Sequence, residues 1–271
     1  MIDNQLFLTV ASSVLLSLGI ISGLILLNTR RKFKKTRSLP KRVPTGIHGL
    51  DETIQGGFIR NTINLVSGGA GTGKTLFGLQ FIHAGALIGE PGIFVSFEEK
   101  KEELIEDGNI FDWDLAKLEK KGKLKILYFS PYELGNFEET IEKTIKKIKA
   151  KRVVIDPFSA LGMGAQSEDQ LGIKQLLSQL EATLKSLNCT SILISEMGGE
   201  APLDITKVHK FSKYEQEEYI CDSVIILHYG AHELAKRYLR IIKMRRTNHV
   251  RLPIPFKITS EKSKKGILVG E

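Results

Sequence analysis

The chain has 271 residues, of which 42% are hydrophobic and 26% are charged, and its formal net charge is +8. Residues 28–42 hold eight basic residues and no acid, so residues 43–271 are almost neutral, at about +1. A nucleic-acid-binding domain is expected to be basic, and this balance argues against one, although a local basic patch stays open. Cys189 and Cys221 lack the spacing of metal ligands, and we expect both to be packing residues.

The first feature along the chain is an apolar segment. Residues 6–27 contain no charged residue, and as a helix they would span about 33 Å, enough to cross a hydrocarbon core of about 30 Å. Basic residues follow this segment, whereas Asp3 alone precedes it. The positive-inside bias therefore predicts a single-pass helix in the cell membrane, with residues 1–5 outside and the rest of the chain in the cytoplasm.

Two alternatives bear on this N-terminal region. A cleaved signal peptide would carry its charges before the apolar core, whereas here they follow it. The basic run 28–42 fits a juxtamembrane linker that contacts anionic lipid better than it fits a nucleic-acid site. About 229 residues remain after the linker, and residues 43–271 suit one domain with a sizeable core.

A glycine-rich motif opens this domain. It follows the apolar run 62–66 and leads into a helical stretch at residues 76–82, which is the strand, loop and helix context of a P-loop. Its glycines let backbone N–H groups wrap a polyphosphate, while the lysine reaches the β- and γ-phosphates and the last threonine ligates Mg²⁺. The predicted nucleotide-binding residues are Gly68, Gly69, Ala70, Gly71, Thr72, Gly73, Lys74 and Thr75.

Apolar strands and helical stretches alternate after the P-loop. Helices are expected after Asn136, as a cap, and over residues 171–187, where Asn188 ends the helix. Near-continuous apolar strands between helices predict an α/β fold with a mostly parallel central sheet flanked by helices. The predicted strands are residues 92–97, 124–129, 152–156, 191–195 and 224–227, followed without intervening helices by 238–244 and 256–259.

Carboxylates follow two of these strands. Asp156 ends an apolar strand, as the Walker B aspartate does, and is expected to hold Mg²⁺ opposite Thr75. Glu98 and Glu99 end the strand that comes after the P-loop helix. Ligands of open α/β sheets bind at the carboxyl ends of strands, where a glutamate can orient water and accept its proton. The alternative for this pair is the solvated start of a helix.

The motifs, taken in order, resemble those of KaiC-like ATPases of the RecA superfamily. The resemblance covers about residues 43–260, and the combination is specific although each piece alone is not. It is carried by residues 44–51, Gly56 and Gly57, the P-loop, and residues 94–99, 214–227, 243–249 and 255–258.

The resemblance implies an ATPase that uses ATP and Mg²⁺, with Glu98 as the general base and Glu99 in support. It also implies that Lys243, Arg245 and His249 reach the γ-phosphate of a neighbouring subunit, and therefore a ring, usually of six subunits. The alternative for this segment is a basic strand end.

Two departures from the family limit what carries over. The clock protein KaiC is a tandem of two such domains, whereas this chain has one. Its phosphorylated serine and threonine correspond here to Glu218 and Tyr219, which argues against a clock function and against autophosphorylation at that site.

Three functions are compatible with these features. The first is a membrane-anchored, Mg²⁺-dependent ATPase that assembles with itself into a ring and acts on an unknown protein partner. The second is a nucleotide-gated scaffold, or regulatory subunit, with little intrinsic hydrolysis. The third, a RecA-type recombinase, is disfavoured by the neutral charge of the domain and by the anchor, so we do not expect a nucleic-acid partner.

Overall fold

A computed structural model of the chain describes residues 39–132, 135–161, 170–197, 211–214, 217–230, 236–261 and 264–270, together with Ser22. The chain divides into two units, Met1–Pro40 and Lys41–Glu271. Apart from Ser22, the predicted membrane segment 6–27 lies outside the described residues. Within the described ranges, no helix has both the length and the apolar character that a membrane span requires. The membrane helix therefore stays a prediction.

The core of the second unit is a nine-stranded sheet with the order β11-β10-β9-β8-β3-β7-β6-β4-β5. The six strands from β8 to β5 in this order are parallel, and β9, β10 and β11 extend the sheet in antiparallel fashion. The strands are β3 (Ile63–Gly68), β4 (Gly92–Ser96), β5 (Leu124–Tyr128), β6 (Arg152–Asp156), β7 (Thr190–Glu196), β8 (Ser223–Tyr229), β9 (Arg237–Met244), β10 (Ile254–Thr259) and β11 (Gly266–Val269).

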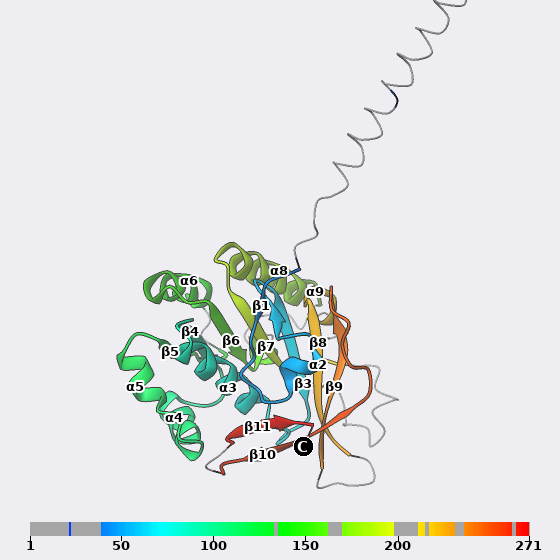
Figure 1. Cartoon of the computed structure of the whole chain (residues 1–271). Helices are drawn as coiled ribbons and strands as arrows, with labels where there is room; N and C mark the ends of the chain where they lie inside the picture. Colours follow the sequence, from blue (N-terminus) through cyan, green and yellow to red (C-terminus); the bar gives the residue numbers. More distant parts are fainter. Residues whose placement is uncertain are drawn as a thin grey trace, which may run out of the picture. The chain divides into compact units, whose positions relative to one another are not determined.

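Helices cover both faces of this sheet (Figure 1). A separate two-stranded ribbon pairs β1 (Arg42–Val43) with β2 (Phe58–Ile59). The predicted α/β fold, with a mostly parallel sheet flanked by helices, is confirmed. The helices are α2 (Leu50–Thr53), α3 (Lys74–Leu87), α4 (Lys101–Ile110), α5 (Leu115–Lys120), α6 (Phe137–Ile148), the 3₁₀ turn η1 (Phe158–Ala160), α8 (Gln170–Ser186) and α9 (Glu217–Ile220).

Two hydrophobic clusters fix these layers. On one face, Phe77 and Phe81 of α3 and Leu104 of α4 pack with sheet residues such as Phe94. On the other face, α6 and α8 supply Ile141, Ile145, Leu177 and Leu184 to a cluster with sheet residues such as Leu193. Each such side chain contributes roughly 1.5–3 kcal/mol when it is fully buried, so the apolar faces of the helices determine which face of the sheet they cover.

The parallel strands end at a common edge of the sheet. Gly68 of β3 pairs with Glu196 of β7, and Ser96 of β4 pairs with Asp156 of β6. We call this side, where β3, β4, β6 and β7 end, the nucleotide edge, and the side where they begin the opposite edge. The chemistry predicted at strand ends is thereby collected at one edge of the sheet.

Local structure departs from expectation at several points. Asn136 occupies the N-cap position of α6, but its side chain makes no capping hydrogen bond, so that prediction is wrong in its mechanism. Asn188 does follow the end of α8, and its φ of 58° takes the left-handed conformation that stops a helix. The buried, unpaired thiols of Cys189 and Cys221 confirm both as packing residues.

Candidate functional site

The P-loop lies between a fully buried strand and a long helix. Gly68 ends β3, and Lys74 begins α3. Gly71 and Gly73 take φ values of 69° and 101°, which side chains with a Cβ rarely adopt. A Cβ on Gly73 would also lie 2.9 Å from Cδ1 of Ile258. The unpaired N–H groups at the start of α3 and the positive end of its dipole favour an anion at this loop.

Lys74 folds back over the loop. Its Nζ donates a hydrogen bond to the Gly69 carbonyl at 2.9 Å. Burial lowers the pKa of the ammonium, while the carboxylates of Asp156, Glu196 and Glu98 oppose that shift. The ammonium is therefore held at the nucleotide edge and carries the positive charge that a β- or γ-phosphate requires.

Thr75 and Asp156 form the predicted metal pair. The Thr75 hydroxyl lies close enough to the Asp156 carboxylate to lower its pKa, so the start of α3 and the end of β6 lie side by side. The pKa of Asp156 is raised to about 7, chiefly by burial; repulsion from Glu99 and Glu98 contributes to the rise, whereas Thr75 and Lys74 oppose it. A buried carboxylate whose ionisation is this costly is suited to a bound cation, and oxygen ligands are those that Mg²⁺ prefers. The residues therefore fit Mg²⁺.

Glu98 and Glu99 follow β4, next to β6 in the sheet. The Glu98 side chain is exposed, and Glu99 is half-buried with an Oε2 that has no hydrogen-bond partner among the described residues. Burial raises the pKa of Glu99, with additional repulsion from Asp107, Glu103 and Glu98. The structure therefore gathers Glu98 and Glu99 with Lys74, Thr75 and Asp156.

The alternative interpretation of Glu98 and Glu99, as the solvated start of a helix, also agrees with their surroundings. The helix α4 begins at Lys101, and the Lys100 backbone N–H donates to Glu103 at 2.6 Å. Glu98 and Glu99 thus precede a helix start as well as ending a strand. Their catalytic role stays a prediction, and exposure to water favours Glu98 as the base.

Lys243, Arg245 and His249 lie elsewhere. Lys243 pairs with Val224 near the start of β8, whereas Gly68 pairs with Leu227 further along that strand. Val224 and Leu227 are three positions apart in β8, which corresponds to about 10 Å along the strand. The structure does not bring these three side chains to the P-loop of their own chain.

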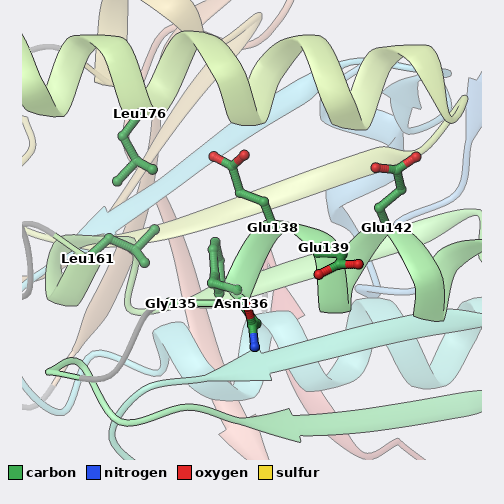
Figure 2. Close-up of a pocket in the computed structure, with 8 residues that line it drawn as sticks. Gly135, Asn136, Glu138, Glu139, Glu142, Leu161 and Leu176 are labelled. Carbon is green, nitrogen blue, oxygen red and sulfur yellow. The ribbon is translucent and has the colours of Figure 1, made fainter.

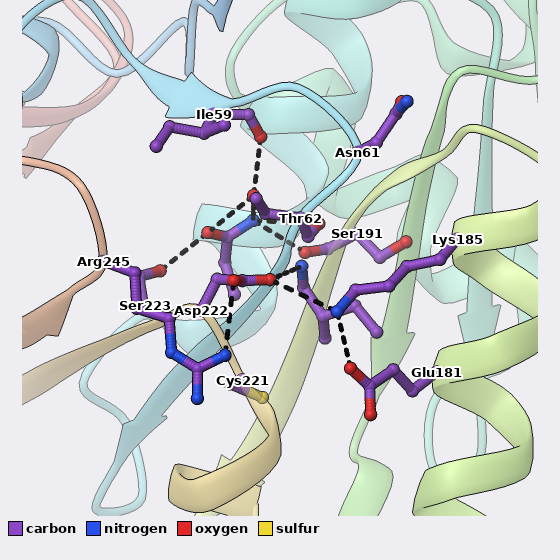
Figure 3. A network of polar contacts seen from close by, with 12 residues as sticks. Ile59, Asn61, Thr62, Glu181, Lys185, Ser191, Cys221, Asp222, Ser223 and Arg245 are labelled. Carbon is purple, nitrogen blue, oxygen red and sulfur yellow. Dashed lines mark hydrogen bonds and ion pairs between the residues drawn. The ribbon is translucent and has the colours of Figure 1, made fainter. Parts of the chain in front are cut away.

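Contacts within the chain hold this segment at the opposite edge. Lys243 Nζ donates to the carbonyls of Glu218 and Cys221, both at 2.7 Å, and burial lowers its pKa. Arg245 donates to the Tyr219 carbonyl at 3.2 Å and lies 3.5 Å from the Asp222 carboxylate. Figure 3 shows Asp222 between Arg245 and Lys185. The His249 ring contacts the carbonyl of the next residue in the chain, with Nδ1 2.9 Å from the oxygen of Val250.

Two residues at the nucleotide edge were not predicted from the sequence. Tyr229 donates its hydroxyl to the Gly71 carbonyl at 2.8 Å, and the Arg237 guanidinium lies 5.2 Å from the centre of the Tyr229 ring. No local pattern marks this contact, because it depends on how β8 and β9 lie beside the loop. Glu196 ends β7 beside Gly68, and the rule that singled out Asp156, a carboxylate after a buried strand, would have found it.

A separate pocket of about 450 Å³ lies at the start of α6 (Figure 2). Glu138, Glu139 and Glu142 line it, together with Leu161 and Leu176. Its negative charge opposes binding of a polyphosphate, and none of the predicted site residues lines it. The nucleotide site is therefore assigned to the P-loop and not to this pocket.

Asp156→Asn is expected to stabilise the domain when nucleotide and Mg²⁺ are absent. The folded-state pKa of about 7 exceeds the ordinary 3.8, so ionisation destabilises the fold progressively above 3.8 and fully above 7. The variant should show a free energy of unfolding higher by a few kcal/mol at pH 8, at about 1.4 kcal/mol per unit of pKa shift, and no gain below pH 3.8. Denaturant unfolding at both pH values measures this; Glu106→Gln, at an exposed position of α4, is the control. A variant less stable than its parent at pH 8 contradicts the assignment.

Tyr229→Phe is expected to weaken ATP binding about fivefold, because one hydrogen bond of about 1 kcal/mol no longer holds the loop at Gly71. The ring stays beside the Arg237 guanidinium, although the 3.3 Å hydrogen bond that Arg237 Nη2 donates to the hydroxyl is lost as well. Turnover at saturating ATP should change less than the affinity. Calorimetric titration measures the affinity. Tyr238→Phe is the matched control, since it removes a hydroxyl from the adjacent strand, where the ring stacks on His228 at 5.7 Å. Equal affinities for both variants would show that the hydroxyl does not support the loop.

Comparison with known proteins places this geometry in a family. A family model described as the ATPase KaiC matches residues 43–270. The circadian clock oscillator protein KaiC of Parathermosynechococcus lividus is 38% identical over 248 residues, which are 86% of this chain and 44% of that protein. The same protein of Synechococcus elongatus is 36% identical over 230 residues, 80% of this chain and 43% of that protein. The chain thus spans less than half the length of these curated relatives.

A solved structure of a similar protein supports the same family assignment. The crystal structure of a KaiC-like protein from Pyrococcus horikoshii matches with a TM-score of 0.73 and 39% identity, over 85% of this chain and 99% of that one. The likeness extends over almost all of that chain, so the predicted RecA-like architecture is confirmed. The chain belongs to the KaiC family of P-loop ATPases.

Proposed function

We propose that this protein is a membrane-anchored, Mg²⁺-dependent ATPase whose subunits form a ring and complete one another's active sites. One observation carries the proposal. Lys74, Thr75, Asp156 and Glu98 share the nucleotide edge, whereas Lys243 and Arg245 lie at the opposite edge of the same sheet. Cations held there can act on a triphosphate only if that triphosphate belongs to another copy.

Each residue has a chemical task in this mechanism. The loop N–H groups and Lys74 bind the β- and γ-phosphates. Thr75 and Asp156 would hold Mg²⁺, which when bound neutralises charge on the phosphate oxygens. Glu98 orients a water on the γ-phosphorus and takes its proton as ADP leaves, while Lys243 and Arg245 of the neighbour stabilise the charge of the transition state.

The relation between the two edges supports a closed assembly. A contact of the nucleotide edge with the opposite edge of the next copy is heterologous, and such contacts form rings when the rotation closes. Six subunits is the number that the family resemblance implies. His249 belongs to the same segment and is proposed to assist Lys243 and Arg245.

A nucleotide-gated scaffold is the second candidate, and one observation favours it. The two cations are already occupied within their own chain, Lys243 by two carbonyls at 2.7 Å and Arg245 by Tyr219 and Asp222. Unless a neighbour draws them away, ATP would bind and set the assembly without sustained turnover.

Turnover across protein concentration separates the two candidates. A protein starting at Ser38 should show turnover per subunit that rises with concentration, because the site is completed by a neighbour. Glu98→Gln should bind ATP as the parent does and lose turnover at least about 100-fold, since the base is removed. Glu102→Gln, exposed in the first turn of α4, is the matched control. Tight binding with negligible turnover at every concentration would favour the scaffold, and equal turnover in Glu98→Gln would refute the base.

The membrane anchor completes the proposal. Residues 6–27 are long and apolar enough to span a bilayer, and the basic residues that follow favour a cytoplasmic ATPase domain. The linker and first domain residues, 28–44, reach roughly 50 Å when extended, at about 3.3 Å per residue. Several anchors could therefore enter the membrane from one face of a ring, with lipid and an unknown protein as further partners.

Extraction of membranes tests the anchor. The full chain is expected to stay in the membrane pellet after alkaline carbonate treatment, because a spanning helix is released only by detergent. A matched variant in which the eight basic residues of 28–42 become glutamine should also stay, since those residues set orientation and lipid contact and not insertion. Release of the full chain by carbonate or by high salt would contradict a spanning helix.

A further inference from the structure

A buried carboxylate outside the ATPase mechanism belongs to α9, which packs on the face of the sheet that α6 and α8 cover. Glu217, the first residue of α9, has no exposed surface. Its two oxygens accept hydrogen bonds from the hydroxyls of Ser195, at 3.1 Å, and Ser212, at 2.7 Å. A buried carboxylate is strongly destabilising unless its oxygens are bonded, so these contacts fix where α9 begins.

The partners of Glu217 belong to the nucleotide edge. Ser195 precedes Glu196, whose strand position pairs with Gly68 at the root of the P-loop. The neighbouring segment 211–214 is tied to the same edge, because Lys213 lies 3.6 Å from the Glu196 carboxylate. Tyr214 donates to the Ser159 carbonyl at 2.7 Å, three residues after Asp156. The start of α9 is thus bonded to β7 through Ser195, and the preceding segment 211–214 is tied to the end of β7 and to η1, which follows β6.

The other end of α9 holds the cations. Its carbonyls and that of Cys221 accept from Lys243 and Arg245, as described above, and the backbone N–H of Arg245 donates to the Asp222 carbonyl at 2.9 Å. The Asp222 carboxylate lies against Arg245 (Figure 3). Arg246 approaches the same carboxylate to 3.9 Å. The helix is one turn long, about 6 Å, so a displacement of its first residue displaces these carbonyls directly.

We propose that Glu217 is a positioning residue, which ties α9 to the nucleotide edge and thereby sets where Lys243 and Arg245 are offered to the next subunit. The inference rests on the proposed trans completion. It adds a physical link between the nucleotide site of a subunit and the cations that the same subunit supplies to its neighbour. A change at the end of β7 would pass through Ser195 and Glu217 to those cations.

Mixing two variants of the full chain tests this link. The accepting subunit carries Arg245→Ala and an intact P-loop, and the supplying subunit carries Glu98→Gln and an intact Arg245. Neither is expected to turn over ATP alone, and their mixture should regain turnover. Glu217→Gln is then added to the supplying subunit only, so any loss must come through the cations.

The expected loss of regained turnover is about tenfold or more, since misplacement by about 1 Å can cost up to about 100-fold. The KM for ATP should not change, because the accepting site is intact. Ser212→Ala in the supplying subunit should act in the same direction with little risk to folding. The matched control is Glu218→Gln, because its carboxylate accepts from the Phe211 N–H at 3.1 Å and a glutamine oxygen can still do so. It should stay within about twofold.

Each outcome of the mixing experiment supports or overturns either the trans completion or the role of Glu217. A mixture that regains no turnover overturns the trans completion itself. Regained turnover that neither Glu217→Gln nor Ser212→Ala reduces, in mixed assemblies confirmed by co-purification, leaves trans completion standing and overturns the role of Glu217. An equal loss with Glu218→Gln also overturns it, because the effect would then belong to α9 in general. If Glu217→Gln fails to assemble, Ser212→Ala alone decides.

Discussion

The pairing of β3 on both sides is the constraint on which the site depends. β3 lies between β7 and β8 in parallel register, and all of its residues are buried. Its last residue, Gly68, is therefore held from both neighbours just before the chain enters the P-loop. A loop that must keep its N–H groups free for a ligand cannot stabilise itself with them, and the strand supplies the rigid base instead.

The change of strand direction after β8 separates the two halves of the catalytic set. Parallel strands return their carboxyl ends to one edge, which places Asp156, Glu98 and Glu196 beside the P-loop. The antiparallel hairpin from β8 to β9 brings Arg237 to that same edge and carries Lys243 to the opposite one. No adjustment of side chains could bring Lys243 to its own P-loop, so in the proposed mechanism topology and not flexibility sets the need for a second copy.

The sequence predicts best where chemistry and structure are local. The P-loop, the strand that ends in Asp156 and the carboxylates after β4 are contiguous, and their roles follow from one rule about strand ends. Tyr229 and Glu217 could not be found in this way, because their contacts with Gly71 and Ser195 join segments 158 and 22 residues apart. Asn136 shows the opposite kind of error, a local pattern that predicts a contact the structure lacks. The residue type suits a helix cap, but its side chain makes no capping hydrogen bond.

The two cations at the opposite edge are not equally free to leave. Arg245 has 48% of its side chain exposed, so water screens its 3.5 Å contact with the largely buried Asp222 carboxylate. Lys243 is half-buried and donates to two carbonyls at 2.7 Å, so its departure would leave both without that donor. In the proposed ring, a neighbour's triphosphate would therefore draw Arg245 away from its contacts more readily than Lys243. Both side chains carry the same charge, so in the proposed mechanism their different burial and hydrogen bonding would decide which cation moves first.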